Sequence, residues 1–189
     1  LVFELIPRID GEFRGSPLRT NSAGFRDPER ILTKAPDTFR IAALGDSILF
    51  GWGVAAETRL TNLLERFLND TAPQGKRFEV LNFGVPGYNT VLEAECLKSR
   101  ALAYQPDAVL LTFCLNNDAT MPNFVARKPN LWTLRRCFAW EAMRRKGVSG
   151  VRENAGIGLQ GDDAKKVPPQ YQYLVGWDAA NNALAEISR

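Results

Sequence analysis

Three short apolar runs constrain the fold of this chain more than any other feature. They are FRIAAL (39–44), FEVLNF (78–83) and AVLLTFC (108–114). None alternates strictly between apolar and polar residues, so each is typical of a central parallel strand covered on both faces. Two stretches with apolar residues at helical spacing, 57–69 and 90–104, separate the runs. The order predicts an α/β protein: a three-layer α/β/α sandwich around a doubly wound, mainly parallel sheet.

Each run leads into a short polar or glycine-rich turn. These turns are GDS at 45–47, NFGVPG at 82–87 and NND at 116–118. In a doubly wound sheet the ligand crevice lies beyond the carboxyl ends of the strands. We therefore expect the three turns to meet at one edge of the sheet and to form the functional site.

A chain of 189 residues suits one hydrophobic core. Residues 1–38 are predicted to be an N-terminal extension built of loops, in which TNSAGFRD (20–27) forms an ordered turn. Residues 39–189 are predicted to form the domain, with a helical and loop insertion at about 119–175.

Within that insertion we expect a basic helix at 130–146 and a mobile loop over 147–175, followed by a last helix at 176–189. An alternating pattern calls for a fourth strand, and its absence predicts that the domain is incomplete at its C-terminal side.

Charge and cysteine usage exclude several classes of function. A net charge of +3 with scattered basic residues does not indicate a nucleic-acid partner. The basic helix could contact an anionic membrane surface, although a solvated face is the favoured interpretation. Cys96, Cys114 and Cys137 have no metal-site spacing and are interpreted as core thiols.

Ser47, Gly84 and Asn117 are the candidate site residues, one from each turn. A serine at a strand-to-helix turn lies near free backbone N–H groups and can serve as a nucleophile, or it can simply cap the helix. Gly84 lets a backbone N–H approach a ligand closely, or it merely permits a tight turn with Pro86 and Gly87. The Asn117 amide can donate to a developing negative charge, or it can form an Asx-type turn.

Together, GDSILFG, VLNFGVPG and LNND at the ends of successive strands resemble the blocks of the SGNH/GDSL hydrolases. This superfamily comprises serine esterases, lipases and related acyl or acetyl hydrolases. The resemblance covers about residues 20–120, and TNSAGFRD resembles the lead-in of many bacterial membrane-anchored or exported members. It implies a flavodoxin-like fold, catalysis without metal or organic cofactor, a small-molecule or carbohydrate ester as substrate, and a bacterial periplasmic or extracytoplasmic location with an N-terminal membrane anchor.

The resemblance also implies roles for individual residues. Ser47 would be the nucleophile, and Gly84, Asn117 and the Ser47 backbone would supply the oxyanion donors. Asp46 would orient the turn and Asp118 would brace the strand end. The usual glycine of the third block is missing, because Leu115 and Asn116 precede Asn117.

Two aromatic residues flank these blocks. Trp52 and Tyr88 are expected to line the substrate pocket, and packing is the alternative for both.

The superfamily's fourth block, D-x-x-H, has no match in this chain, which contains no histidine. Asp178 begins DAAN and is not assigned, and no S-x-x-K motif offers a serine–lysine dyad. The simplest expectation is that the chain stops before the segment that carries the base.

Two classes of function follow from these observations. The first is a serine ester hydrolase, either an esterase or lipase or a carbohydrate O-acyl or acetyl esterase, with acyl transfer as a variant of the same chemistry. The second is a catalytically inactive module that binds an acylated glycan or a protein partner. A nucleotide site is disfavoured, because GWGVAA (51–56) has only two of the three glycines of a dinucleotide motif and lies too far past the strand.

Overall fold

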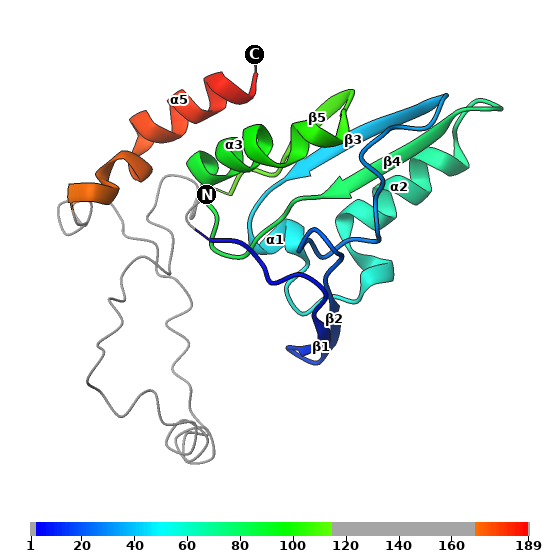
Figure 1. The fold of residues 1–189 in the computed structure, drawn as a ribbon, viewed down its shortest axis with the longest axis horizontal. Coiled ribbons are helices and arrows are strands. Elements are labelled where there is room, and N and C mark those ends of the chain that lie inside the picture. The colour runs from blue at the N-terminus through cyan, green and yellow to red at the C-terminus, as the bar shows by residue number, and fades with distance from the viewer. Residues whose placement is uncertain (1–2, 115–168, 189) are drawn as a thin grey trace.

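The computed structural model describes residues 3–114 and 169–188 (Figure 1). Its centre is a sheet of three parallel strands in the order β4–β3–β5, formed by β3 (Thr38–Leu44), β4 (Arg77–Asn82) and β5 (Ala108–Leu111). Ile41 of β3 pairs with Val80 of β4 on one side and with Ala108 of β5 on the other. The first strand of the three therefore lies in the middle, as in flavodoxin-like sheets. The predicted fold class is confirmed.

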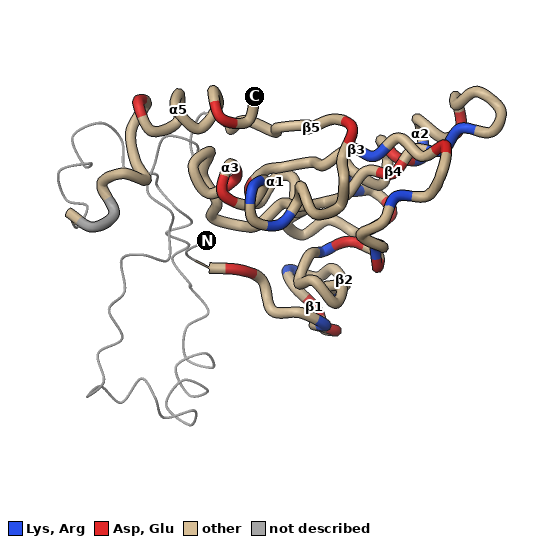
Figure 2. The backbone as a smooth tube through the Cα atoms, turned by 45° about the horizontal axis from the view of Figure 1, so that its top comes forward, with Lys and Arg blue, Asp and Glu red and all other residues tan. Residues whose placement is uncertain are grey.

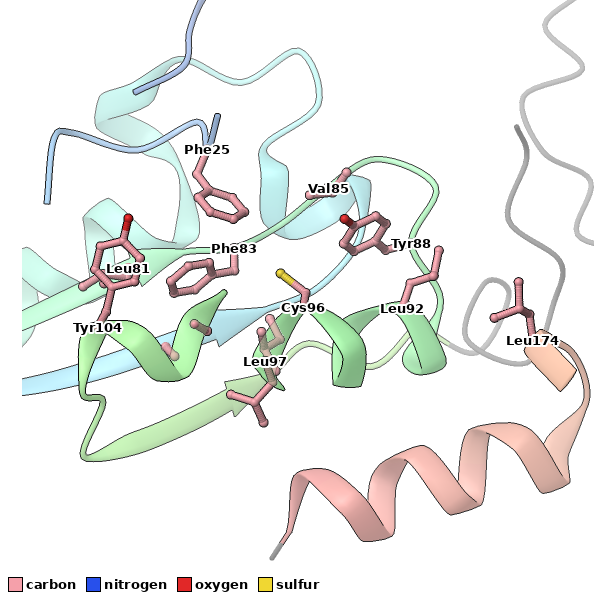
Figure 3. Packing of buried hydrophobic residues seen from close by; sticks show 13 residues of the cluster. Phe25, Leu81, Phe83, Val85, Tyr88, Leu92, Cys96, Leu97, Tyr104 and Leu174 are labelled. Carbon is pink, nitrogen blue, oxygen red and sulfur yellow. The ribbon is translucent and has the colours of Figure 1, made fainter. Parts of the chain in front are cut away.

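Successive residues of the central strands point to opposite faces of the sheet. Ala42, Leu44 and Leu81 belong to one core cluster with residues of α3 (Thr90–Ser99), shown in Figure 3. Ala43 and Val80 belong to a second cluster, against which Leu64 and Leu68 of α2 (Leu60–Asp70) pack. Both faces are covered because the runs carry no polar alternation, and this gives the three layers.

The helices are shorter than their periodicity predicted. The stretch 57–69 forms a 3-10 turn, η1 (Ala56–Thr58), and then α2, with extended backbone at Arg59 between them. The stretch 90–104 divides into α3 and the 3-10 turn η2 (Ala101–Tyr104).

The predicted last helix is present as α5 (Trp177–Ile187), which packs on α3 and follows the 3-10 segment η5 (Pro169–Leu174). The basic helix at 130–146 and the loop up to residue 168 lie outside the described residues, as does most of the insertion at 119–175.

The N-terminal region was expected to be built of loops, but it contains a β-hairpin. Strands β1 (Asp10–Phe13) and β2 (Ser16–Arg19) pair antiparallel, with Phe13 opposite Ser16. In Figure 2 the backbone of this hairpin is coloured for both basic and acidic residues. The two loop residues, Arg14 and Gly15, have φ angles of 54° and 76°. Positive φ at both positions gives the tight hairpin turn whose twist matches paired strands.

The tract 20–27 is an ordered turn, as predicted. The Asn21 side chain accepts hydrogen bonds from the backbone N–H groups of Ala23 and Phe25, at 3.1 and 2.9 Å. Phe25 packs edge-on against Phe83 at the end of β4, with ring centroids 4.7 Å apart. This tract therefore shares the core of the sheet, while the predicted domain boundary after residue 38 stays a prediction.

No helix within the described ranges is both long and apolar enough to cross a membrane.

Candidate active site

Ser47 is the first residue of α1 (Ser47–Phe50), a helix of four residues that follows β3 (Figure 1). The residue before it, Asp46, caps this helix, because its buried carboxylate accepts a hydrogen bond from Ile48 N at 2.8 Å. The half-buried Ser47 hydroxyl is thus not the cap, and it has no hydrogen-bond partner within 3–114 and 169–188. Asp46, and not Ser47, is therefore the N-cap of α1.

Gly45 lets this turn pass close to its neighbours. A Cβ atom at Gly45 would overlap Thr112 Oγ1 and lie 2.7 Å from Leu49 Cβ. Thr112 itself is bound to the end of β3, since both its backbone N–H and its hydroxyl donate to Leu44 O. Only glycine therefore fits between the end of β5 and α1.

The loop after β4 is bound to α1 through Asn82. The Asn82 side-chain NH₂ donates to Leu49 O at 3.1 Å, and its Oδ1 accepts from Gly84 N at 2.9 Å. A Cβ at Gly84 would lie 2.5 Å from Phe50 N, and Val85 N donates to Gly45 O at 3.0 Å. The first and second predicted turns therefore lie side by side at the carboxyl edge of the sheet.

The two glycines of this loop have different environments. The Gly84 N–H is buried and already bound to Asn82, so it can serve as an oxyanion donor only if the Asn82 side chain releases it. Gly87 is half-buried, has a φ of +88°, and its N–H has no acceptor in the described part of the chain. Gly87 was expected only to form the turn, because no local sequence pattern shows which backbone N–H is already bound.

A sequence model of the GDSL-like lipase/acylhydrolase family matches residues 43–187, a range that includes Ser47, Gly84 and Asn117. The chain belongs to this family. The resemblance seen in the sequence is therefore confirmed, and the positions of the GDS and NFGVPG turns at one edge of the sheet agree with it.

Solved structures of esterases and acylhydrolases also resemble this family member. One is a mutant of esterase AlinE4, with 25% identity over 42% of each chain and a TM-score of 0.34. Another is the lipase/acylhydrolase from Enterococcus faecalis, with 23% identity over 79% of this chain and 73% of that one, and a TM-score of 0.38. The chain thus spans less than half of the AlinE4 esterase. No curated protein matches.

Asn82 provides a direct test of how the GDS turn is held. Replacing it by alanine removes its bonds to Leu49 and Gly84 and leaves buried groups unpaired, so we expect a loss of about 3 kcal/mol in the free energy of unfolding. Asn69→Ala is the matched control, because Asn69 also bonds the backbone but is exposed, and its loss should cost about 1 kcal/mol. Urea unfolding measures both, and equal losses would show that Asn82 holds nothing specific to this turn.

The remaining predicted site residues of this GDSL-family chain are placed differently from one another. Trp52 is 45% exposed and packs on Phe13 of the hairpin, with ring centroids 4.7 Å apart. Tyr88 is only 1% exposed, its hydroxyl donates to Phe3 O, and burial raises the pKa of its phenol. In this structure Tyr88 is therefore a core residue, in agreement with the alternative that it serves packing and does not line a pocket. Asn117 and Asp118 lie outside the described residues.

A buried carboxylate lies in the ordered turn that precedes the sheet. The Asp27 side chain is 3% exposed and pairs with Arg30 at 2.9 Å, while its other oxygen has no partner in residues 3–114 or 169–188. Burial raises the pKa of Asp27 to about 6, because the loss of hydration outweighs the attraction of Arg30.

This shift predicts a specific pH dependence of stability. The folded state binds a proton more tightly than the unfolded chain, so the contribution of Asp27 is fully present below the unfolded pKa of about 4 and is lost as the pH rises through about 6. The stability of the wild type minus that of Asp27→Asn should therefore fall by about 2 kcal/mol from pH 4 to pH 7. Urea unfolding at several pH values measures this difference, and a difference that stays flat or grows with pH contradicts the assignment.

No group of three or more His, Cys, Asp or Glu side chains in the described ranges could hold a metal ion.

Proposed function

We propose that this protein hydrolyses ester bonds with Ser47 as its nucleophile. The observation that carries the proposal is the position of Ser47 at the start of α1, where Asp46 supplies the cap and leaves the serine hydroxyl half-exposed without a described partner. A serine hydroxyl in this position can attack a carbonyl carbon once an adjacent base takes its proton.

In the proposed reaction, Ser47 Oγ loses its proton and forms a bond to the ester carbonyl carbon, and the carbonyl oxygen becomes an oxyanion. Collapse of this intermediate expels the alcohol, which takes up the proton and leaves an acyl group on Ser47. A water molecule then attacks the acyl group, releases the acid and restores the hydroxyl. The substrate class is a small-molecule or carbohydrate ester, and the exposed ring of Trp52, five residues after Ser47, would border the site.

Three groups are proposed to stabilise the oxyanion. The Ser47 N–H is at the first position of a helix, where backbone donors have no intrahelical acceptor. The loop after β4 supplies the second donor, which we assign to Gly87 because the Gly84 N–H is bound to Asn82. The Asn117 amide is the third donor. Each is worth about 3–4 kcal/mol of barrier by analogy with the deletion of one oxyanion-hole side chain.

The proton of Ser47 requires a base, and none of the 189 residues is a histidine. We propose that a D-x-x-H segment of the natural protein supplies it, as the family resemblance implies. The experiments below therefore use the natural protein.

A fluorophosphonate probe tests the nucleophile, because it forms a covalent bond only with an activated serine. We expect one label per molecule of the natural protein, and peptide mass spectrometry should locate it on Ser47. Residues 1–189 should react far more slowly, since removing a member of the catalytic machinery leaves only the residual effects of binding and oxyanion stabilisation. No label, or a label on another serine, contradicts the proposal.

The lack of histidine supports one second candidate, an inactive module that binds an acylated glycan or a protein partner in the same crevice. This candidate predicts that the natural protein binds an acetylated glycan without turnover. Calorimetry with that glycan and an assay for released acetate distinguish the two functions.

A further inference from the structure

The helix that carries Ser47 cannot be stable on its own. Four residues form little more than one turn, and a helix of this length gains too few hydrogen bonds to offset the ordering of its backbone. Its C-terminal carbonyl groups also lack helical partners. Side chains from elsewhere in the chain must therefore fix its position.

The last carbonyl groups of α1 are bound by two side chains distant in sequence. Leu49 O accepts from Asn82, as described above. Phe50 O accepts from Arg26 Nη1 at 3.2 Å, and Gly51 O accepts a short hydrogen bond from the same nitrogen. Arg26 thus binds the end of the helix opposite Ser47.

The second terminal nitrogen of the same guanidinium group binds two further backbone carbonyl groups. Arg26 Nη2 donates to Val54 O and to Pro17 O, both at 2.8 Å. The guanidinium lies over the Phe50 ring, 5.1 Å from its centroid. One side chain therefore joins the turn after α1 to strand β2.

Arg26 is 3% exposed, and no carboxylate forms an ion pair with it within 3–114 and 169–188. A buried positive charge is costly unless it is compensated. Here the compensation comes from backbone carbonyl groups at the C-terminus of α1, which carry partial negative charge.

Arg59 supports this arrangement from a second position. Its Nη1 donates a short hydrogen bond to Arg26 O. Gly51 has a φ of +80°, and a Cβ there would lie 2.7 Å from Arg59 Cγ and 3.3 Å from Arg26 Nη1. The helix ends at a glycine because both arginine side chains pack against that point.

We propose that Arg26 is a positioning residue for Ser47: its guanidinium group binds the carbonyl groups that end α1 and thereby fixes the nucleophile at the other end of that helix. The ordered turn at 20–27 is then part of the support of the nucleophile. This inference rests on the proposed function of Ser47 for its catalytic consequence, but its structural consequence can be measured independently.

The experiment compares Arg26→Gln with Arg40→Gln in the natural protein. Arg40 is the matched control, because it is 2% exposed and also donates to a backbone carbonyl group, Tyr104 O, but it lies near the start of β3, away from the candidate site. Arg26→Lys is the second variant, used if glutamine prevents folding. A lysine keeps the charge but cannot hold four carbonyl groups in the fixed geometry of a guanidinium.

Two readouts separate positioning from a general loss of stability. The first is the rate of Ser47 labelling by the fluorophosphonate probe, which Arg26→Gln should lower by about 100-fold, since a displacement of about 1 Å has effects of that size. The second is hydrogen exchange of the amides of residues 50–54, which should become at least about tenfold faster as their bonding to α1 loosens. Arg40→Gln should change neither by more than about threefold when both variants are measured well below their unfolding transitions.

The outcomes decide the two proposals separately. Unchanged exchange at 50–54 in Arg26→Gln, or equal changes in Arg40→Gln, overturns the positioning role. If the wild type does not react with the probe, the function proposed for Ser47 fails, and the exchange measurement alone decides whether Arg26 fixes α1.

Discussion

Replacing Ser47 by alanine is expected to lower ester turnover by the natural protein by at least about 10⁴-fold. The proposed reaction forms its covalent bond to Ser47 Oγ, and removal of a catalytic serine has costs of this order in serine hydrolases. The measurement is steady-state hydrolysis of p-nitrophenyl acetate, with the uncatalysed rate subtracted.

The same substitution should leave the fold intact. Because the Ser47 hydroxyl has no hydrogen-bond partner among the described residues, its removal should change the free energy of unfolding by less than about 1 kcal/mol. Ser99→Ala is the matched control, since Ser99 is an exposed serine at the end of α3. Ester turnover by the Ser99→Ala variant should stay within about twofold of the wild type. Turnover retained in Ser47→Ala would rule out Ser47 as the nucleophile.

Replacing Gly84 by alanine is expected to destabilise the protein by about 3 kcal/mol. The added methyl group would lie 2.5 Å from Phe50 N and 2.9 Å from the Leu49 carbonyl carbon, and both are backbone atoms that cannot rotate away. Either the loop after β4 or α1 must shift, and overpacking of this kind costs about 1–3 kcal/mol. Since that shift moves the helix that carries Ser47, labelling of Ser47 should also slow.

Gly11→Ala is the matched control for this substitution. Gly11 lies in β1, nothing is within 4 Å of its added Cβ, and its φ is not positive. Its stability should stay within about 0.5 kcal/mol of the wild type in urea unfolding. If Gly84→Ala were as stable as Gly11→Ala, the close approach of the loop to α1 would be wrong.

The strands and their order along the chain could be predicted from the sequence. FRIAAL, FEVLNF and AVLLTFC carry their signal locally, because a strand covered on both faces needs apolar residues without alternation. The parallel arrangement follows from the helix-length segments between them, since parallel strands need a crossover connection. The helix ends were less well predicted. The apolar residues of η2 continue the pattern of α3 with 3-10 geometry, and the polar residues at 57 and 58 belong to η1 and not to α2.

The hairpin at 10–19 was missed because its strands are short and largely exposed. Four residues with little apolar content carry no alternation to detect. The turn residues Arg14 and Gly15 also give a weak signal, because positive φ is typical of Gly, Asn and Asp and not of arginine.

For the candidate site, too, the sequence predicted some features and missed others. The sequence pointed to Ser47 as a nucleophile, since the GDS turn follows an apolar strand and precedes a helix. It did not show that Asp46 caps that helix, or that Asn82 binds the Gly84 N–H while the Gly87 N–H is left without a described acceptor. Those hydrogen bonds depend on which acceptor the folded chain places next to each backbone N–H.

The sequence by itself determined the class of fold, the order of its strands and the turn that holds Ser47, because periodicity and turn residues act over a few neighbouring positions. Only the tertiary structure decided what holds that turn in place. Arg26 reaches α1 across 24 positions of the chain and Asn82 reaches it across 33, and neither contact leaves a trace in local patterns. The reason is physical: a four-residue helix has too few internal hydrogen bonds to fix itself, so its geometry comes from side chains that folding brings to it.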